Sequence, residues 1–244
     1  MSSSSSVPDY LREENLTQET RELISSLPSE KGWLVSQMYQ YQGRWHTQAL
    51  LQGILTCQKH FEAKDSDIIL VTNPKSDCDS RNPKDMFVSL WHFGKKLAPE
   101  ETADYPIEKA VEAFCQGKFI GGPFWDHVLE YWYASLKNPE KVLFVSYEEL
   151  KKQTGDTVKR IAEFLGCGVI GEEKVRDIVK LCSFESLSSL EVNKEGKLPS
   201  GMETKDFFRK GEVGGWRDTL TESLAEIDFF KLASFLVFGF LCGL

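Results

Sequence analysis

The spacing of apolar residues along the chain predicts mostly helices. Apolar positions recur every three or four residues in 23–27, a short helix that Pro28 ends, and again in 50–55. The same spacing predicts further helices over residues 86–97, 107–114, 125–136, 156–165 and 172–182. Each of these segments has one apolar face, which we expect to be buried against the others.

Two shorter runs have the pattern of buried strands. Asp67–Thr72 and Lys141–Ser146 are apolar and rich in β-branched residues, and each precedes a predicted turn or helix. Strands that lead into helices favour an α/β fold with a parallel sheet flanked by helices. Residues 193–202 are polar and contain Gly and Pro, so we expect a mobile loop there.

Three polar segments suit the binding of an anion. Asn73–Ser76 follows the first predicted strand, Arg81 stands just before a helix, and Phe208–Arg217 sets two cations beside glycines that let the backbone approach closely. In α/β folds, helix N-termini beyond the carboxyl ends of strands bind anions. Together the segments predict a site for a phosphate-rich nucleotide. The spacing GxxxxGK[ST] is absent from the sequence, which disfavours an ATPase or kinase.

Composition narrows the class of protein. The 244 residues are 41% hydrophobic, enough for one domain, with two not excluded. A net charge of -8 argues against a nucleic-acid-binding protein. The six cysteines and four histidines lack metal-ligand spacing, so we expect reduced thiols and no metal. Because the first residues are polar and unlike a signal peptide, a cytoplasmic location is expected.

Several motifs between about Leu16 and Glu226 resemble those of the plant cytosolic sulfotransferases, and they occur in the family's order. They are PKS at 74–76, RNPKDMFVSLWHF at 81–93, GPFWDHVLEYW at 122–132, FVSYEEL at 144–150 and FFRKGEVGGWRD at 207–218. The resemblance implies a P-loop-like α/β fold. It also implies transfer of a sulfuryl group from 3′-phosphoadenosine 5′-phosphosulfate (PAPS) to the hydroxyl of a small phenolic or steroid-like acceptor, without a metal.

The resemblance also implies roles for the residues that bind PAPS. Lys75 would be the catalytic residue, steadying charge on the leaving oxygen, and Ser76 belongs to the same loop. The residues implied to hold the 3′-phosphate are Arg81, Ser89, Arg209, Lys210 and Gly211. A dianionic phosphate suits an arginine fork together with backbone N–H groups, so the chemistry of the residues agrees with these roles.

Aromatic residues complete the implied site. Tyr147 would reach the adenine edge, although an aromatic residue after a strand is otherwise commonly structural. Tyr39, Tyr41 and Trp45 resemble positions of the acceptor pocket, and they could equally belong to the core.

One stretch of the family's pattern is missing. After Pro-Lys-Ser the family continues with Gly-Thr-Thr-Trp, whereas this chain has residues 77–80, DCDS, and then Arg81 at once. By the resemblance, the absent part holds a helix under the phosphosulfate, the tryptophan that stacks on adenine, a strand and the histidine that accepts the acceptor's proton. The histidines of this chain, at 46, 60, 92 and 127, all stand outside that motif. We therefore expect a fold that lacks one or more βα units, and activity that is impaired or lost.

The end of the sequence departs from the family as well. Residues 229–244 are apolar where relatives carry charge, but only 13 residues follow Lys231, short of the ~20 that span a membrane. A packed or aggregation-prone tail is favoured over a membrane anchor. The predicted organisation is a flexible lead over 1–15, a single domain over 16–228 with a deletion at about 76–80, and the tail over 229–244.

Two departures in one chain suggest a truncated or mis-spliced product. Three interpretations follow: an impaired sulfotransferase, a non-catalytic nucleotide-binding relative, and a non-functional fragment. The acceptor and the oligomeric state are not readable from the sequence.

Overall fold

The computed structural model describes residues 15–64, 66–71, 81–97, 104–198, 202–227 and 229. Its α-helices are α1 (Gln18–Ser26), α2 (Gln48–His60), α3 (Pro83–Leu97), α4 (Ile107–Cys115), α5 (Phe124–Lys137), α6 (Tyr147–Lys152), α7 (Thr154–Phe164), α8 (Glu172–Leu181), α9 (Phe184–Ser189), α10 (Glu191–Lys194) and α11 (Glu222–Glu226). Its strands are β1 (Ser29–Glu30), β2 (Met38–Tyr41) and β3 (Arg44–His46), and the 3₁₀ turns that bear on the site are η4 (Thr204–Phe207) and η5 (Gly215–Asp218).

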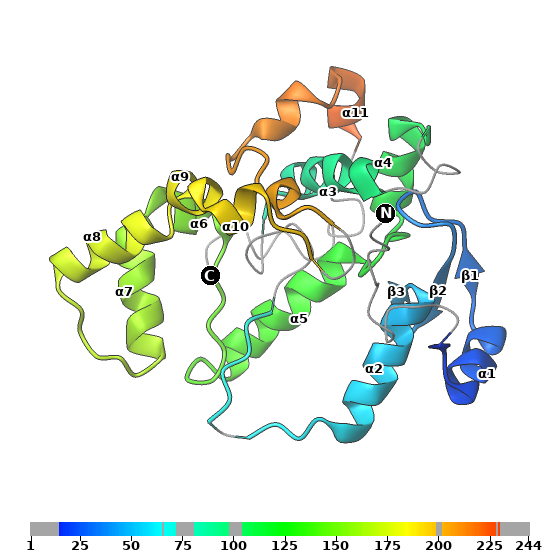
Figure 1. The fold of residues 1–244 in the computed structure, drawn as a ribbon, viewed down its shortest axis with the longest axis horizontal. Helices are drawn as coiled ribbons and strands as arrows, with labels where there is room; N and C mark the ends of the chain where they lie inside the picture. Colours follow the sequence, from blue (N-terminus) through cyan, green and yellow to red (C-terminus); the bar gives the residue numbers. More distant parts are fainter. Residues whose placement is uncertain are drawn as a thin grey trace, which may run out of the picture.

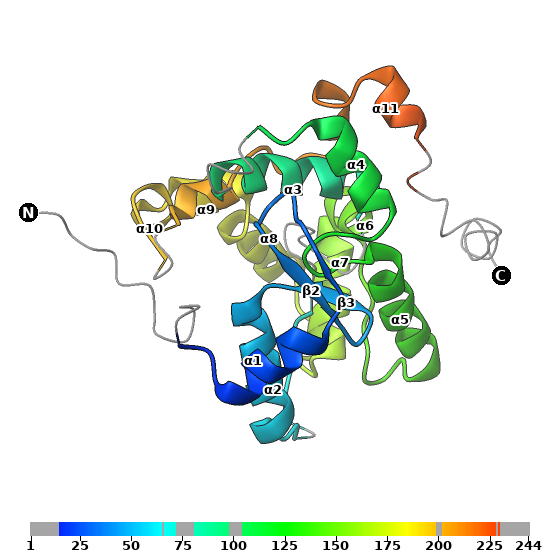
Figure 2. The ribbon, with the colours of Figure 1, turned by 90° about the vertical axis from the view of Figure 1, so that its right-hand side faces the viewer.

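Helix α3 occupies a central place in the molecule. Figure 1 shows α3 above the diagonal helix α5, with α11 above α3, and the turns η4 and η5 contact α3. Helices α7 and α8 form one end of the molecule, and the small sheet with α1 and α2 forms the opposite end (Figure 1). Figure 2 places strands β2 and β3 between α3 and the pair α1 and α2.

The predicted helices are present, and local caps explain where several of them begin. The side chain of Thr17 accepts a hydrogen bond from the backbone of Thr20 at the start of α1, and Thr47 does the same for Leu50 at the start of α2. Helix α1 ends before Pro28, as predicted, and α3, α4, α5, α7 and α8 match their predicted ranges to within a few residues. These helices therefore follow from local sequence.

The main core surrounds α3, whose inward face is aromatic. The ring centroid of Phe87 lies 5.4 Å from that of Phe114 in α4 and 5.7 Å from that of Trp33. Aromatic pairs at such separations stabilise a core beyond the area they bury. The buried cluster consists of Trp33, Met86, Phe87, Val88, Leu90, Trp91, Ala110, Val111, Phe114, Phe119, Phe124, Val128, Leu220, Leu224 and Phe229. Its members come from helices and connecting loops.

The described sheet is a small antiparallel one, in the order β1-β2-β3. A two-residue turn joins β2 to β3, and both of its residues have positive φ, 49° at Gln42 and 79° at Gly43. Such turns match the twist of a hairpin and favour glycine at the second position. The sequence analysis missed this hairpin, although the alternation before Gln42-Gly43 was a signal for it.

Both strands predicted for the parallel sheet are wrong in the described residues. Residues 67–71 are extended but belong to no strand, with Ile68 74% and Leu70 92% exposed; Thr72 lies outside the described ranges. Residues 142–145 are also extended without forming a strand, and they are half-buried. A buried strand needs neighbouring strands to satisfy its backbone and cover its side chains. The incompleteness expected from the missing segment is thus located in the sheet.

The remaining predictions concern loops and termini. The segment predicted as a mobile loop begins inside α10, and Lys197 pairs with Glu203 in an antiparallel bridge; residues 199–201 are outside the described part. Residues 1–14 of the predicted lead lie outside the described residues, and so do residues 230–244 of the predicted tail. Phe229 itself is 2% exposed and belongs to the core, so the core extends into the segment assigned to the tail. Among the described helices, none is both long and apolar enough to cross a membrane.

Candidate anion and nucleotide site

Arg81 forms the centre of the site, immediately before α3. Its side chain is 4% exposed, and its guanidinium carbon lies 4.4 Å from the ring centroid of Tyr147, the first residue of α6. The Nη2 atom donates a hydrogen bond of 3.1 Å to the carbonyl oxygen of Glu212. The backbone N–H of Asn82 donates to a Glu148 carboxylate oxygen at 2.8 Å. Arg81 is therefore held between α6 and the loop before η5.

Arg209 brings a second guanidinium close to the first. Burial lowers the pKa of Arg209, and the positive charge of Arg81 lowers it further, whereas Asp85 and other carboxylates oppose the shift. The Nε atom of Arg209 is buried and has no hydrogen-bond partner among the described residues. Two neighbouring like charges, one buried and one half-buried, favour an anion between them, and the N-terminal end of the α3 dipole adds to the positive potential beside Arg81.

Asp85 links α3 to the loop that carries Arg209. Its carboxylate is buried and accepts hydrogen bonds from the backbone N–H groups of Gly214, at 2.7 Å, and Trp216, at 2.9 Å. Nearby, the Lys84 ammonium lies 4.8 Å from the ring centroid of Trp216. The sequence analysis did not single out Asp85. An aspartate in the first turn of a helix that follows an anion-binding arginine was the available signal.

Three other predicted phosphate-binding residues occupy different environments. Ser89 is buried nearly two turns into α3. Gly211 has φ +64°, and a Cβ atom there would come within 2.7 Å of the Phe184 ring, so only glycine fits. Lys210 is exposed and forms an ion pair with Asp218. Of the predicted phosphate-binding residues, Arg81 and Arg209 lie near enough for the charge of Arg81 to lower the pKa of Arg209, whereas Lys210 pairs with Asp218 at the surface.

A pocket of about 550 Å³ opens between α6 and the loop that follows Arg209. Its lining residues are Glu148, Lys151, Lys152, Gly211, Glu212 and Val213. Tyr147, the residue implied to reach adenine, precedes this lining directly in the chain and lies under Arg81. The pocket therefore lies between the helix that begins at Tyr147 and the loop that follows Arg209.

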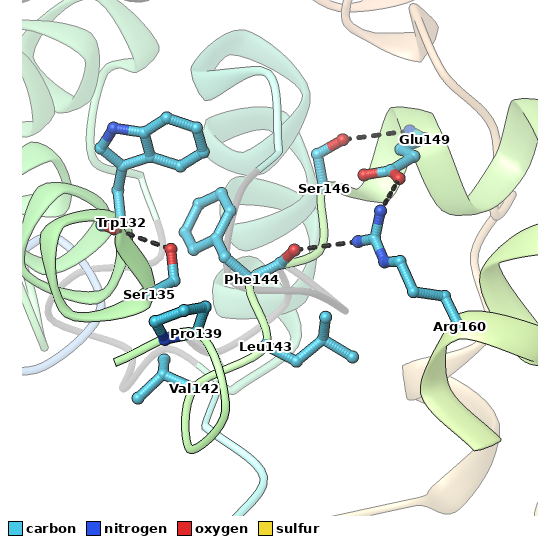
Figure 3. A pocket seen from close by; sticks show the side chains of 9 residues that line it. All are labelled: Trp132, Ser135, Pro139, Val142, Leu143, Phe144, Ser146, Glu149 and Arg160. Carbon is cyan, nitrogen blue, oxygen red and sulfur yellow. Dashed lines mark hydrogen bonds and ion pairs between the residues drawn. The ribbon is translucent and has the colours of Figure 1, made fainter. Parts of the chain in front are cut away.

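A second pocket, of about 430 Å³, runs along the segment that was predicted to be the second strand (Figure 3). The rings of Trp132 and Phe144 meet edge to face in its wall, with centroids 5.4 Å apart. Arg160 donates a 3.0 Å hydrogen bond to the carbonyl of Phe144 and forms an ion pair with Glu149 (Figure 3). A side chain thus satisfies a backbone group for which a strand would use its neighbour. The lining residues are Trp132, Ser135, Pro139, Val142, Leu143, Phe144, Ser146, Glu149 and Arg160.

The predicted acceptor residues do not share one face of the hairpin. Tyr39 and Tyr41 are two residues apart in β2 and so share one face of the hairpin. Gln40, between them, points to the other face and pairs with Trp45 of β3. Because paired residues of antiparallel strands point to the same face, Trp45 faces away from the two tyrosines. Trp45 is buried, and its backbone bonds to the loop at Gly121. Lys75 and Ser76, the predicted phosphosulfate residues, lie outside the described residues.

The described histidines sit in different surroundings. His92 lies 2.9 Å from the hydroxyl of Thr219, and burial followed by the charge of Arg209 lowers its pKa. Burial and the charge of Arg44 lower the pKa of His46 and His127 as well. Within the described ranges, no group of His, Cys, Asp or Glu side chains could hold a metal ion.

These features define a class of protein before any comparison is made. A buried arginine at the start of a helix, with a half-buried arginine nearby and an open pocket beside them, suits a protein that binds a phosphate-bearing nucleotide. The chain belongs to the sulfotransferase family: the profile of the sulfotransferase domain matches residues 73–229. This chain is 62% identical over 307 residues to cytosolic sulfotransferase 12 of Arabidopsis thaliana, and the alignment covers 93% of this chain and 94% of the relative. Cytosolic sulfotransferase 13 of the same plant is 42% identical, with 92% and 93% covered.

Solved structures agree with this assignment. The crystal structure of an Arabidopsis thaliana putative steroid sulphotransferase matches with a TM-score of 0.68 and 48% identity, covering 98% of this chain and 99% of that one. A mouse sulfotransferase, SULT7A1, complexed with PAP matches with a TM-score of 0.50 and 29% identity, over 59% of this chain and 51% of that one. The predicted family, transferase class and incomplete α/β fold are confirmed.

The comparisons also bear on the missing segment. The alignment with cytosolic sulfotransferase 12 extends over 307 residues, which is 63 more than the 244 residues of this chain. Positions of the relative therefore lack counterparts here, as a deletion requires.

Proposed function

We propose that this chain is a PAPS-dependent sulfotransferase by descent that retains the grip on the nucleotide's 3′-phosphate but transfers sulfuryl groups slowly or not at all. The observation that carries the proposal is that Arg81, buried just before α3, and Arg209, beside the turn that Asp85 of α3 holds, both contact the same loop region. Two adjacent guanidinium groups are suited to a phosphate dianion and are repulsive without one. The nucleotide expected to bind is the desulfated product, adenosine 3′,5′-bisphosphate (PAP), as well as PAPS.

The relatives support this nucleotide. The mouse sulfotransferase is complexed with PAP, and a retinol dehydratase that matches with a TM-score of 0.52 was solved with androsterone and inactive cofactor PAP. By analogy, the acceptor would be a small phenolic or steroid-like molecule with a free hydroxyl. We also place the protein in the cytoplasm, because the relatives are named cytosolic sulfotransferases.

Slow transfer follows from the chemistry of the missing segment. In phosphoryl transfer, which sulfuryl transfer resembles, the protein positions the reactants, stabilises charge and orients the nucleophile. Loss of a general base slows such reactions by roughly 10²- to 10⁴-fold. Loss of a helix N-terminus at the transferring group removes electrostatic stabilisation as well. Asp77 and Asp79 closely follow Lys75 and Ser76 in the sequence, and their negative charges disfavour binding of the negatively charged phosphosulfate.

Calorimetric titration separates the binding part of the proposal from a non-functional fragment. PAP is expected to bind the purified full chain more tightly than adenosine 5′-monophosphate, which lacks the 3′-phosphate. Arg209→Ala should abolish this preference, whereas Arg176→Ala, an exposed arginine of α8, should preserve it. Equal binding of the two nucleotides, or no binding of either, would rule out a working 3′-phosphate grip.

A transfer assay tests the second part. The full chain and Arabidopsis cytosolic sulfotransferase 12 are incubated with PAPS and a panel of hydroxylated phenols and steroids. We expect turnover by the chain to be lower by at least roughly 10²-fold, the lower end of the loss of a general base. Turnover comparable with that of the relative would contradict the proposal.

The transcript across codons 70–90 decides how the deletion arose. A transcript that runs directly from the Ser76 codon to the Arg81 region would establish the shortened protein. An uninterrupted Gly-Thr-Thr-Trp segment in the transcript would instead assign the deletion to an isoform or an artefact, and the complete enzyme would then be expected.

A further inference from the structure

Asp85 holds an unusual position for an ionised side chain. It is 1% exposed, and each of its two carboxylate oxygens accepts one backbone hydrogen bond from the turn at η5. A buried carboxylate is costly unless such donors satisfy it, and hydrogen bonds to a charged group are stronger than neutral ones. Gly214, one of the donors, has φ +83°, a conformation that the turn requires.

The turn that Asp85 anchors supports Arg209. The guanidinium of Arg209 packs against the anchored turn at Gly215: a Cβ atom built on Gly215 would lie only 3.9 Å from the Nη2 atom of Arg209. The loop between them also supplies the Glu212 carbonyl that accepts a hydrogen bond from Arg81. Asp85 therefore acts on a loop that contacts both arginines, and its negative charge partly offsets the repulsion between them.

We propose that Asp85 is a positioning residue: its buried carboxylate fixes the Gly214–Trp216 turn against α3 and so holds Arg209 beside Arg81 before the anion binds. The inference rests on the proposed function for the identity of that anion. Asp85 itself need not touch the nucleotide, because both of its oxygens are engaged by backbone N–H groups.

A merely structural role would give a different pattern of effects. Asp206, in η4, also tethers this part of the chain to α3 through an ion pair with Lys96, but it does not bond to the turn at η5. Asp206→Asn is therefore a matched control that removes the same charge from the same side of α3. Asp85→Asn replaces one accepting oxygen by an amide that cannot accept a hydrogen bond.

The first measurement needs no nucleotide. In the full chain labelled with ¹⁵N, hydrogen exchange of the Gly214 and Trp216 amides should become about 10- to 100-fold faster in Asp85→Asn, as the loss of a charge-assisted hydrogen bond predicts. The Nε–H signal of Arg209, which arises from a buried atom, should broaden or exchange faster. Asp206→Asn should change neither. Unchanged amides and an unchanged Arg209 signal in Asp85→Asn would overturn the proposal.

The second measurement is a double-mutant cycle on PAP affinity. Asp85→Asn should weaken PAP about 10-fold or more and leave adenosine 5′-monophosphate nearly unaffected. In an Arg209→Ala background it should weaken PAP no further, because Asp85 acts through Arg209. An additive loss would refute this route. If the unmodified chain fails to bind PAP, the proposed function fails, whereas the exchange and Arg209 signals still decide whether Asp85 positions the loop.

A folding control completes the test. Far-ultraviolet circular dichroism and the urea midpoint are measured for every variant. If Asp85→Asn does not fold, Asp85→Glu takes its place, since it keeps the charge but displaces both oxygens by one methylene. The same local loosening around Gly214 and Arg209 is then expected, and its absence counts against the proposal.

Discussion

At the residue scale, buried Arg81 and half-buried Arg209 are each subject to opposing effects. Burial and mutual repulsion disfavour their charges, which is why the pKa of Arg209 is lowered. The ring of Tyr147 and the carbonyl of Glu212 stabilise the charge of Arg81. The Asp85 carboxylate raises the pKa of Arg209, whereas the charge of Arg81 lowers it. A phosphate between the two guanidinium groups would replace the repulsion by attraction. The arrangement is thus better suited to an occupied site than to an empty one.

Arg81→Lys tests whether the planar fork matters or only the charge. A lysine ammonium is a point charge and cannot stack on Tyr147 as a guanidinium does. PAP affinity should fall by about 10- to 100-fold, the value of a charge-assisted hydrogen bond, with little change for adenosine 5′-monophosphate. Titration calorimetry measures both affinities, and Arg176→Lys is the matched control. An unaltered PAP affinity would show that charge alone suffices.

Phe229 provides a residue-scale test of the chain end. Its ring lies 6.0 Å from both Phe87 and Phe114, and its carbonyl accepts a 2.8 Å hydrogen bond from the Trp125 indole. Phe229→Ala should lower the free energy of unfolding by about 3–5 kcal/mol, because it empties a buried aromatic site. Urea unfolding measures the loss. Phe61→Ala, at a half-exposed ring, should cost clearly less; equal losses would contradict a core position for Phe229.

The notable feature at the element scale is two segments that form no strand with another described part of the chain. Residues 67–70 are solvent-exposed and Val71 is half-buried. Residues 142–144 line an open pocket, and Arg160 donates a hydrogen bond to the carbonyl of Phe144. Exposed, β-branched and apolar segments of this kind favour aggregation, because their backbone can pair with another chain. We expect limited solubility from the first segment in particular.

Leu70→Glu tests the exposure of this segment. Because Leu70 is 92% exposed, the substitution should change the free energy of unfolding by no more than about 0.5 kcal/mol. Solubility should rise, since a charge interrupts the apolar run. Urea unfolding and the soluble fraction after expression give the two values. A loss of several kcal/mol would place Leu70 in a buried strand, contrary to the structure. Leu51→Glu, at a fully buried position of α2, supplies the destabilised reference.

At the scale of the whole molecule, the core that the described residues form is built from helices and connecting loops, and the described sheet β1-β2-β3 does not cover it. The buried cluster is formed by residues of α3, α4, α5 and α11 and by neighbouring loops. Helices α7 and α8 at one end, and α1 and α2 at the other, contribute no residue to it. We infer a loosely packed protein whose heat-induced unfolding is broad. A sharp cooperative transition at an ordinary midpoint would contradict this inference.

Acidification should destabilise the folded protein. His46, His92 and His127 all have a lowered pKa in the folded state, chiefly because of burial. The unfolded chain therefore binds more protons as the pH falls through about 6.5, the ordinary histidine pKa, and the free energy of unfolding decreases there. Urea midpoints at pH 7.5 and 5.5 measure the decrease. His92→Gln should reduce it, with His60→Gln, at an exposed imidazole, as control; a midpoint that rises on acidification would contradict the argument.

The sequence was informative about the helices, the family and the residues proposed to bind an anion. Helix hydrogen bonds join residues four apart, so the helical segments and the stop at Pro28 could be predicted from local sequence, whereas the caps at Thr17 and Thr47 were found in the structure. The motif residues Arg81 and Arg209 also pointed to one phosphate-binding site without any structure. The gap after Ser76 was visible in the same way, because motifs that should be far apart are adjacent in this chain.

Tertiary structure decided what depends on distant partners. Asp67–Thr72 has the composition of a strand, but a strand needs neighbours, and the described residues supply none. The register of β2 and β3 set Trp45 apart from Tyr39 and Tyr41, and only packing revealed the anchoring by Asp85 and the burial of Phe229. By itself the sequence determined the family and the helices, and it singled out Arg81 and Arg209 as the arginines predicted to bind phosphate. The tertiary structure decided which apolar segments are buried, since burial depends on partners that a local pattern cannot specify.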